Sequence, residues 1–302
     1  MQQSPLNYTG GKFKLLPQIL PLFPKEINTF VDLFCGGGNV GVNVPCKQVL
    51  FNDIDKNVIG MLSAFNRLPK DEILHIIADT IEQFGLSRSS ENGYAFYNCN
   101  SKDGLGKHNR EHFLQLREYW NRLEQRDFQY YIQLYVLVVY SFNNQIRFNK
   151  DGLFNLPVGK RDFNVRMQAK LYSFIDRIQS LQCEFSCVDF RQVDVDRLSS
   201  DDFVYADPPY LITCATYNEQ GGWNEDFERS LYRFLDELHA RNIRFALSNV
   251  LTSKGKINVI LQEWIAANPQ YACHHLNYKY SNSNYQLKDR GAVADEVLIK
   301  NY

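Results

Sequence analysis

The stretch that decides the fold is Thr29-Phe-Val-Asp-Leu-Phe-Cys-Gly-Gly-Gly38, an apolar run that ends in three glycines. Short apolar runs bounded by Gly and Asp are typical of buried parallel strands. Glycine permits positive φ and lets a ligand approach the backbone, so a glycine turn after such a strand suits nucleotide binding. The motif is not G-x-G-x-x-G, and no Gly-Lys-Ser/Thr follows, which excludes a phosphate loop. On the loop alone, a tight turn and a ligand site are equally good interpretations.

A second strand is predicted over residues 47–53 and ends at Asp53. An acid at this place can accept both hydroxyls of a ribose, and the alternative is that Asp53 caps the following helix. Strand and helix signals alternate again near the C-terminus, with strands predicted at 202–206, 243–248 and 296–300 and helices at 226–239 and 256–267. This alternation predicts a doubly wound, Rossmann-like α/β sheet.

Between these two parts the sequence pattern changes from alternating strands and helices to helices followed by a polar, basic segment. Apolar residues recur at helical spacing from about residue 56 to residue 140. The segment 143–170 is rich in Asn and carries six basic against two acidic residues. We therefore predict a discontinuous catalytic domain, 1–55 and 171–302, and a mainly helical inserted domain, 56–170.

The segment Phe203-Val-Tyr-Ala-Asp-Pro-Pro-Tyr210 is the most informative for chemistry. Two consecutive prolines fix φ near about −65° and push each preceding residue to an extended conformation. The Asp207 carboxylate and the Pro208 carbonyl are then held side by side, with the Tyr210 ring adjacent. Two fixed acceptors can grip both N–H donors of an exocyclic amine, and the ring can stack on a base turned out of the duplex. A bland surface turn is the weaker alternative at the end of an apolar strand.

The order of these motifs resembles the α-class (Dam-type, D12) DNA adenine-N6 methyltransferases over nearly the whole chain. Asn7-Tyr-Thr-Gly-Gly-Lys12 is similar to the N-terminal motif of that family, residues 32–38 and 52–53 to its cofactor loop and ribose-binding acid, and residues 207–210 to its catalytic motif. The resemblance implies an S-adenosylmethionine cofactor and direct in-line methyl transfer without a covalent enzyme intermediate. The cofactor-binding residues that it implies are Tyr8, Gly10, Gly11, Lys12, Asp32, Phe34, Gly36, Gly37, Gly38, Asp53, Asp189, Phe190 and Asp207. The catalytic residues that it implies are Asp207, Pro208, Pro209 and Tyr210.

The polar segment 141–161 is the predicted target-recognition region. Its Asn149-Lys-Asp-Gly152 predicts a hairpin turn, and a β-ribbon fits the major groove, where Arg reads guanine and Asn or Gln reads adenine. By resemblance to the Dam hairpin, Arg147 is the first candidate for reading a base. The predicted DNA-binding residues are Asn7, Gln145, Arg147, Asn149, Lys150, Asn155, Pro157, Lys160 and Arg161. The alternative is a solvated polar hairpin. Asn7 is neutral where GATC enzymes usually carry a basic residue, so GATC is only the leading candidate site.

Other reactive side chains are interpreted as structural. Cys46 follows Pro45 but lacks the Gln that follows the nucleophile of cytosine-C5 enzymes. His108 and His112 are four residues apart without an identifiable third ligand, so we predict no metal. We expect buried thiols at Cys183 and Cys187. Nothing in the sequence decides whether His274-His275 touches phosphate or lies on a surface strand.

Composition sets the outer limits. The chain has 302 residues with 33 Lys+Arg against 34 Asp+Glu, which excludes indiscriminate coating of polyanions. Basic charge is nevertheless concentrated in residues 1–25 and 143–170, as a DNA cleft requires. Seven scattered cysteines favour free thiols in a reducing compartment, and no stretch looks like a membrane span or a signal peptide. We place the protein in the cytoplasm, encoded by a bacterium or a phage.

Together these features predict a DNA methyltransferase that flips an adenine out of the duplex and methylates its N6. Asp rather than Ser before Pro-Pro-Tyr favours adenine within the family. Cytosine-N4 methylation is one alternative, because the same acceptors hold any exocyclic amine, and a catalytically silent DNA-binding regulator is another. The expected partner is double-stranded DNA, bound by a monomer without metal or membrane, with a cognate restriction endonuclease acting separately.

Overall fold

The computed structural model describes residues 1–8, 10–213, 222–277 and 294–302. Within them the chain forms two compact units, which are treated separately below. The helical unit comprises Met1–Gly11, Gly36–Asn43 and Asp55–Phe185, and the sheet unit comprises Lys12–Cys35, Val44–Ile54 and Ser186–Tyr302. The bounds differ from those of the predicted domains. Compactness does not assign a function, so the division into catalytic and recognition parts stays a prediction.

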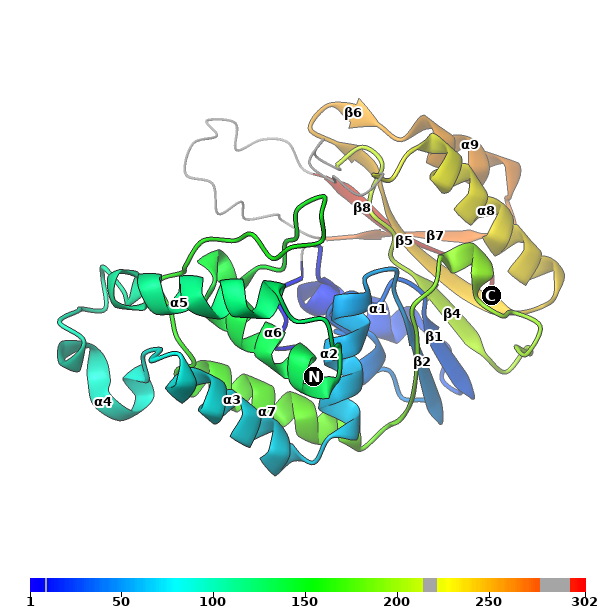
Figure 1. Ribbon diagram of the computed structural model, residues 1–302. Helices are drawn as coiled ribbons and strands as arrows, with labels where there is room; N and C mark the ends of the chain where they lie inside the picture. Colours follow the sequence, from blue (N-terminus) through cyan, green and yellow to red (C-terminus); the bar gives the residue numbers. More distant parts are fainter. Residues whose placement is uncertain (9, 214–221, 278–293) are drawn as a thin grey trace. The chain divides into compact units, whose positions relative to one another are not determined.

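The chain contains both helices and strands, and a run of consecutive helices separates two strand-containing parts (Figure 1). The elements of the described residues are α1 (Leu16–Ile19), β1 (Thr29–Asp32), β2 (Gln48–Asn52), α2 (Lys56–Arg67), α3 (Lys70–Gln83), α4 (Ser89–Phe96), α5 (Gly106–Asn121), α6 (Phe128–Tyr140), α7 (Val165–Gln179), β3 (Gln182–Ser186), β4 (Phe203–Ala206), α8 (Glu225–Ala240), β5 (Arg244–Ser253), β6 (Lys256–Ile257), α9 (Val259–Ala267), β7 (Ala272–Leu276) and β8 (Asp295–Lys300). Short 3-10 turns lie at Lys12–Leu15, Leu20–Leu22, Gly41–Asn43, Phe142–Asn144 and Phe190–Gln192.

The sheet unit is built on strands in the order β2-β1-β4-β5-β8-β7. Neighbours among β2, β1, β4 and β5 are parallel, and β8 lies antiparallel between β5 and β7. The predicted α/β class and strands are therefore confirmed. Parallel strands present their carboxyl ends at one edge, where ligands of α/β sheets bind. The residues that follow β1, β2 and β4 lie at this edge.

Helices α8 and α9 pack against β5 and against each other, beside the sheet in Figure 1. Asn224 caps α8 by accepting from the Phe227 backbone N–H at 3.0 Å, and Asn258 caps α9 through Leu261 at 3.1 Å. The predicted helix over 256–267 is wrong at its start. Gly255 has φ +77°, which closes a tight turn and returns Lys256–Ile257 to pair with β5 as β6.

The helical unit is organised around α6, which contacts α2, α3 and α5. Most of α6 is buried, so the predicted core run at 130–140 is confirmed. Gly60 of α2 allows close packing, since a Cβ there would lie 2.2 Å from the Tyr131 ring. The predicted hairpin does not appear as two continuous strands. Its segment forms two isolated antiparallel bridges, Ser141–Val158 and Phe148–Phe154.

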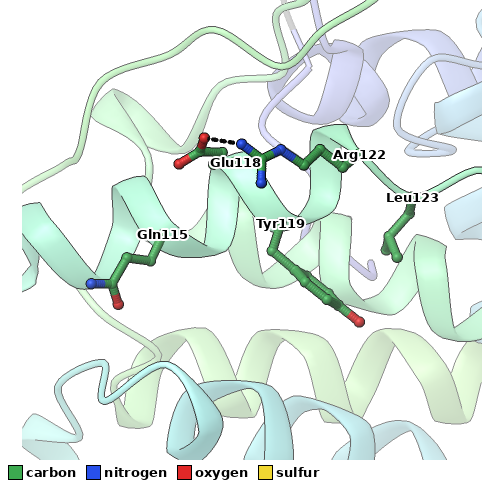
Figure 2. A pocket seen from close by; sticks show the side chains of 5 residues that line it. All are labelled: Gln115, Glu118, Tyr119, Arg122 and Leu123. Carbon is green, nitrogen blue, oxygen red and sulfur yellow. Dashed lines mark hydrogen bonds and ion pairs between the residues drawn. The ribbon is translucent and has the colours of Figure 1, made fainter.

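Two further observations concern the described residues only. Each helix found there is too short or too polar to span a bilayer. A shallow pocket on α5 is lined by Gln115, Glu118, Tyr119, Arg122 and Leu123 (Figure 2). None of these belongs to a predicted site, and the lining carries no group that the predicted chemistry needs.

Candidate active site

The predicted catalytic turn lies directly after β4 in the sheet unit. Asp207 is half-buried, Pro208 and Tyr210 are buried, and Pro209 is exposed. The Thr213 backbone N–H donates to the Tyr210 carbonyl at 2.9 Å, which closes the next turn of the chain. The two prolines stop strand pairing at this point, so the Asp207 carboxylate projects at the carboxyl edge of the sheet.

Lys12 meets Asp207 through a short buried ion pair. The Lys12 Nζ lies 2.9 Å from Asp207 Oδ1, and only 5% of Lys12 is exposed. Its ammonium also lies 4.7 Å from the centroid of the Tyr210 ring. A buried ammonium needs such partners, because burying an isolated charge costs on the order of several kcal/mol. The structure thus joins the predicted N-terminal motif to the predicted catalytic turn.

Glu296 completes this cluster and was missed by the sequence reasoning. It is fully buried on β8, with Oε1 3.5 Å from Lys12 Nζ. The Tyr210 hydroxyl donates to Glu296 Oε1 at 2.9 Å and approaches Asp207 Oδ1 at 3.2 Å. The available signal was an acid at the head of the apolar run Val297-Leu-Ile299. Two carboxylates, one ammonium and one phenol therefore share a single buried network.

Burial raises the pKa of Asp207 above its ordinary value. The Lys12 ammonium and the Tyr210 hydroxyl favour the carboxylate and oppose this rise, whereas the negative charge of Glu296 adds to it. Lys12 therefore favours the carboxylate that the predicted chemistry requires, and burial opposes it.

Asp32, the last residue of β1, and Asp53, which follows β2, both lie near Cys35 in the sheet unit. Burial, followed by the negative charges of Asp53 and Asp32, raises the pKa of the Cys35 thiol well above its ordinary value. Asn52 fixes the neighbouring backbone, donating to the carbonyls of Leu33 at 3.1 Å and Val188 at 3.2 Å. The ends of β1 and β2 are thereby held together beside Asp53.

The cap of α2 decides one alternative left open by the sequence. Asp55, not Asp53, occupies the N-cap, and its side chain accepts from the Asn57 backbone N–H at 2.9 Å. The interpretation of Asp53 as that cap is therefore wrong, because the helix starts two residues later. The ribose-binding interpretation of Asp53 stays a prediction.

An aromatic cluster joins Phe34 and Phe190, which are far apart in sequence. Their ring centroids are 5.5 Å apart, and Trp223 lies 5.7 Å from Phe34 and 5.9 Å from Phe190. Trp223, which no sequence signal singled out, donates through its indole N–H to the buried Glu228. Flat apolar rings of this kind suit the face of an adenine.

Asp189, the fourth member of this neighbourhood, is paired with Arg191. Arg191 donates to its two carboxylate oxygens at 2.8 and 2.6 Å. The hydrogen bonds from Arg191 hold the pKa of Asp189 below its ordinary value. Asp189 also accepts from the Arg191 backbone N–H, so its geometry is fixed before any ligand arrives.

The remaining predicted cofactor residues lie in the helical unit. Gly36 has φ +46°, and a Cβ on it would lie 2.7 Å from Cδ1 of Tyr8. The Gly11 backbone N–H donates to the Tyr8 carbonyl at 3.2 Å. A Cβ on Gly37 would lie 3.2 Å from Ser4 Oγ. The glycine turn is therefore packed directly against the N-terminal motif that holds Tyr8; Gly10 and Gly38 also have positive φ.

The predicted recognition residues are mostly exposed and include Asn7. Asn7 donates through Nδ2 to the Asn143 carbonyl at 3.0 Å, which links the N-terminal motif to the recognition segment. Arg147 donates to Asn155 Oδ1 at 2.8 Å, so Asn155 orients it. Asn149 Oδ1 accepts from the backbone of Asp151 and Leu153 at 3.0 and 2.9 Å and thus builds the predicted turn. The side chains that lie exposed on the surface are Asn7, Gln145, Arg147, Lys150, Pro157, Lys160 and Arg161.

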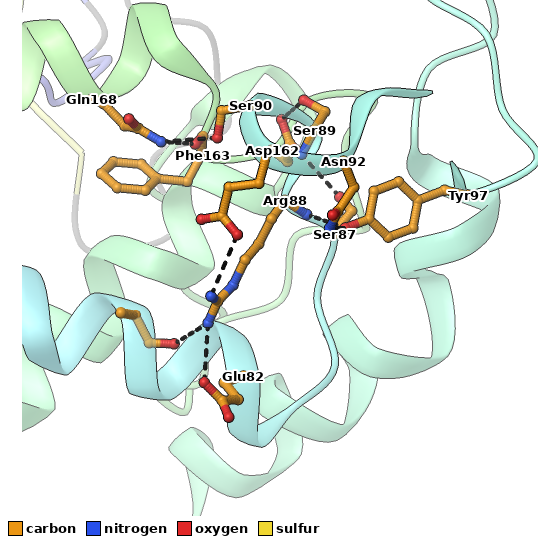
Figure 3. Close-up of polar contacts among 12 residues, drawn as sticks. Glu82, Ser87, Arg88, Ser89, Ser90, Asn92, Tyr97, Asp162, Phe163 and Gln168 are labelled. Carbon is orange, nitrogen blue, oxygen red and sulfur yellow. Dashed lines mark hydrogen bonds and ion pairs between the residues drawn. The ribbon is translucent and has the colours of Figure 1, made fainter. Parts of the chain in front are cut away.

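A buried polar cluster anchors the end of this segment (Figure 3). Asp162 is fully buried and accepts from Ser89 Oγ at 2.7 Å, the Ser89 backbone N–H at 2.6 Å and Ser87 Oγ at 3.2 Å. The adjacent Lys160 carbonyl accepts from the Leu105 backbone N–H at 3.0 Å. The exposed side chains of Lys160 and Arg161 are therefore carried on a fixed backbone.

The other candidates have ordinary surroundings. Cys46 Sγ contacts the Val44 carbonyl at 3.6 Å. The expectation of buried thiols is wrong for Cys187, which is exposed just after the end of β3, and Cys183 is only half-buried. His275 lies on β7 with Nδ1 2.7 Å from Asp295 Oδ1. Among the described residues no group of three His, Cys, Asp or Glu could hold a metal ion. Cys214 lies outside them.

Comparison with known proteins gives consistent matches. A family model described as D12 class N6 adenine-specific DNA methyltransferase matches residues 8–282. The chain is 40% identical over 306 residues to "Modification methylase StsI" of Streptococcus sanguinis, and 39% identical over 306 residues to "Type II methyltransferase M.FokI" of Planomicrobium okeanokoites. Each match covers 99% of this chain and 43% of the relative. "DNA adenine methylase" of Salmonella typhi is 26% identical over 259 residues, 86% of this chain and 82% of that protein. The chain thus spans less than half the length of the first two relatives.

Proposed function

The chain belongs to the D12 class of N6 adenine-specific DNA methyltransferases, and on that premise we propose that it transfers a methyl group from S-adenosylmethionine to N6 of an adenine flipped out of duplex DNA. The observation that carries this proposal is the buried cluster at the end of β4. Asp207 lies there 2.9 Å from the Lys12 ammonium, at the edge of the sheet where ligands of this architecture bind.

The residues present fit the proposed cofactor. Phe34, Phe190 and Trp223 offer flat rings for an adenine, and Asp53 follows β2 where an acid can accept ribose hydroxyls. When bound, S-adenosylmethionine supplies an electrophilic sulfonium methyl group. The cofactor-binding set of the proposal is Tyr8, Gly10, Gly11, Lys12, Asp32, Phe34, Gly36, Gly37, Gly38, Asp53, Asp189, Phe190 and Asp207.

The protein's part in the reaction is to hold the target amine. In the proposal, the Asp207 carboxylate and the Pro208 carbonyl accept its two N–H donors and direct the nitrogen lone pair at the methyl group. Lys12 lies over one face of the Tyr210 ring. A flipped base must therefore stack on the opposite face. An amine held in this way needs no covalent protein nucleophile to activate it.

DNA is proposed to contact the exposed recognition residues of the helical unit. Arg147 is presented for a guanine because Asn155 engages only part of its guanidinium, and Lys150, Lys160 and Arg161 are suited to phosphates. Asn149 acts chiefly through the turn that it closes. In the proposal this segment belongs to a recognition domain over 56–170 that presents a hairpin, and GATC is the leading site. The first relative is named a modification methylase and the second a type II methyltransferase, which supports a restriction–modification role with a separate endonuclease. A monomer acting in the cytoplasm completes the proposal.

The test is to incubate the protein with labelled S-adenosylmethionine and unmethylated DNA, then to digest the DNA to nucleosides. Label should appear in N6-methyladenine, and sequencing of the modified sites should give the recognition sequence. Asp207→Asn should reduce turnover by about 10²- to 10³-fold, the cost of removing one transition-state contact. Label in N4-methylcytosine would overturn the base assignment. Absence of label with intact DNA binding would instead support a silent regulator.

A further inference from the structure

Glu296 is a buried carboxylate of the sheet unit for which the reaction described above has no use. Glu296 is fully buried. It contacts Lys12 and Tyr210, and both of these residues also contact Asp207. A buried acid is costly, so it is retained where its contacts serve a purpose.

The topology explains how Glu296 reaches the catalytic turn. β8 runs antiparallel to β5, so its first residues lie at the carboxyl edge of the parallel strands. Ile299 pairs with Leu247, which pairs with Ala206 of β4, and Glu296 lies three residues further toward that edge. Asp207 follows Ala206 in the same direction. An acid at the start of β8 is therefore directed to the end of β4.

The Tyr210 hydroxyl has a single proton and lies near the carboxylates of both Glu296 and Asp207. Glu296 Oε1 lies at 2.9 Å and Asp207 Oδ1 at 3.2 Å, so the proton is donated preferentially to Glu296. If Glu296 were a weaker acceptor, the proton would turn to Asp207 and occupy acceptor capacity that the target amine needs. Glu296 also holds Lys12 from a second side, 3.5 Å from its Nζ.

We propose that Glu296 is a positioning residue, which draws the Tyr210 hydroxyl and the Lys12 ammonium into one arrangement and so leaves the Asp207 carboxylate available to the target amine. This inference rests on the function proposed above. Glu296 itself does not touch the reacting atoms; it acts through its two neighbours.

The test is Glu296→Gln, which keeps the shape of the side chain but removes its charge. With ¹³C-labelled aspartate, and the Asp207 signal assigned from Asp207→Asn, NMR titration should show a lower pKa for Asp207. Loss of the Glu296 charge and the returning Tyr210 hydrogen bond both favour the carboxylate. The acidic limb of the kcat profile should move to lower pH as well. At the pH optimum kcat should fall about ten- to a hundredfold, the scale of a misplaced reacting group, with KM for DNA little changed.

Asp236→Asn is the matched control. Asp236 Oδ1 accepts from the Tyr271 hydroxyl at 3.0 Å and from Trp264 Nε1 at 3.0 Å in the same unit. This variant loses a comparable carboxylate–phenol contact, and it should leave the Asp207 titration unmoved. A shift of equal size in both variants would mean general destabilisation and overturn the inference.

A double-mutant cycle tests the route through Tyr210. In a Tyr210→Phe background Glu296→Gln has no hydroxyl to redirect, so its effect on kcat should shrink. Additive effects would contradict the route, and an unmoved Asp207 pKa with unchanged kcat in Glu296→Gln would overturn the inference outright. Should Glu296→Gln fail to fold, Tyr210→Phe alone should change the Asp207 pKa little, because the hydroxyl it removes donates to Glu296. A large rise would place that hydroxyl on Asp207 and overturn the inference. A wild-type protein without turnover would refute the proposed function, whereas the NMR titration would still decide the role of Glu296.

Discussion

The contact between Gly36 and Tyr8 allows a graded test of the cofactor turn through Gly36→Ala. Gly36 has φ +46°, and its new Cβ would lie 2.7 Å from Tyr8 Cδ1. The left-handed backbone costs a non-glycine residue about 1–2 kcal/mol. The Tyr8 ring must also move, because a real Cβ does not tolerate that distance. If Tyr8 contacts the cofactor, loss of one ring contact worth about 0.5–1.5 kcal/mol raises Kd about two- to twelvefold.

Gly93→Ala separates these two contributions. Gly93 lies in the same unit with φ +73°, and a Cβ there would meet no atom within 4 Å. Urea unfolding should show a loss of stability in both variants, whereas calorimetric titration with S-adenosylmethionine should show weaker binding only in Gly36→Ala. Introducing Tyr8→Ala as well should abolish the difference. Unchanged cofactor affinity in Gly36→Ala, or an equal loss in Gly93→Ala, would refute the reasoning.

Three further outcomes are expected. Because burial raises the pKa of Asp207 and the reaction needs its carboxylate, the rate should fall with acid at a higher pH than an ordinary aspartate titrates; a pH–rate profile with its midpoint at or below the ordinary value would contradict this. Arg147→Ala should cost about 1–3 kcal/mol in binding to cognate DNA and little at a site changed at the contacted pair, while Lys150→Ala should weaken binding to both; equal losses on both DNAs with Arg147→Ala would argue against base reading. Asp162→Ala should lower the free energy of unfolding by several kcal/mol, since buried donors lose their acceptor at about 1–3 kcal/mol each. By contrast, Asp176→Ala, which removes the exposed partner of a surface lysine, should cost about 0–1 kcal/mol in the same denaturation experiment.

Much of the sheet could be predicted because its signals are local. The runs ending at Asp32, Asn52 and Ala206 are apolar, short and stopped by Gly, Asp or Pro, and each is a strand. Local signals failed where two patterns compete. The sequence pattern of residues 256–267 predicts one helix. Gly255, however, has a left-handed backbone conformation that turns the chain, so the first two residues pair with the sheet.

The candidate site divides in the same way. Asp207 was identifiable because two prolines restrict the backbone beside it, and the glycine turn because a row of three glycines marks close approach. Trp223 and Glu296 carried no comparable signal. A tryptophan in a loop and an acid at the start of a strand acquire meaning only from the rings and charges that the fold brings near them.

By itself, then, the sequence determined the family, the strands and the turns that end them, because φ restriction and apolar patterning act between neighbouring residues. The tertiary structure alone decided which groups meet at the end of β4. Antiparallel insertion of β8 places Glu296 beside Lys12 and Tyr210, and Lys12 arrives from the other end of the chain to reach Asp207 at 2.9 Å. Electrostatic interactions depend on distances of a few ångströms in a buried environment, and sequence separation does not encode such distances.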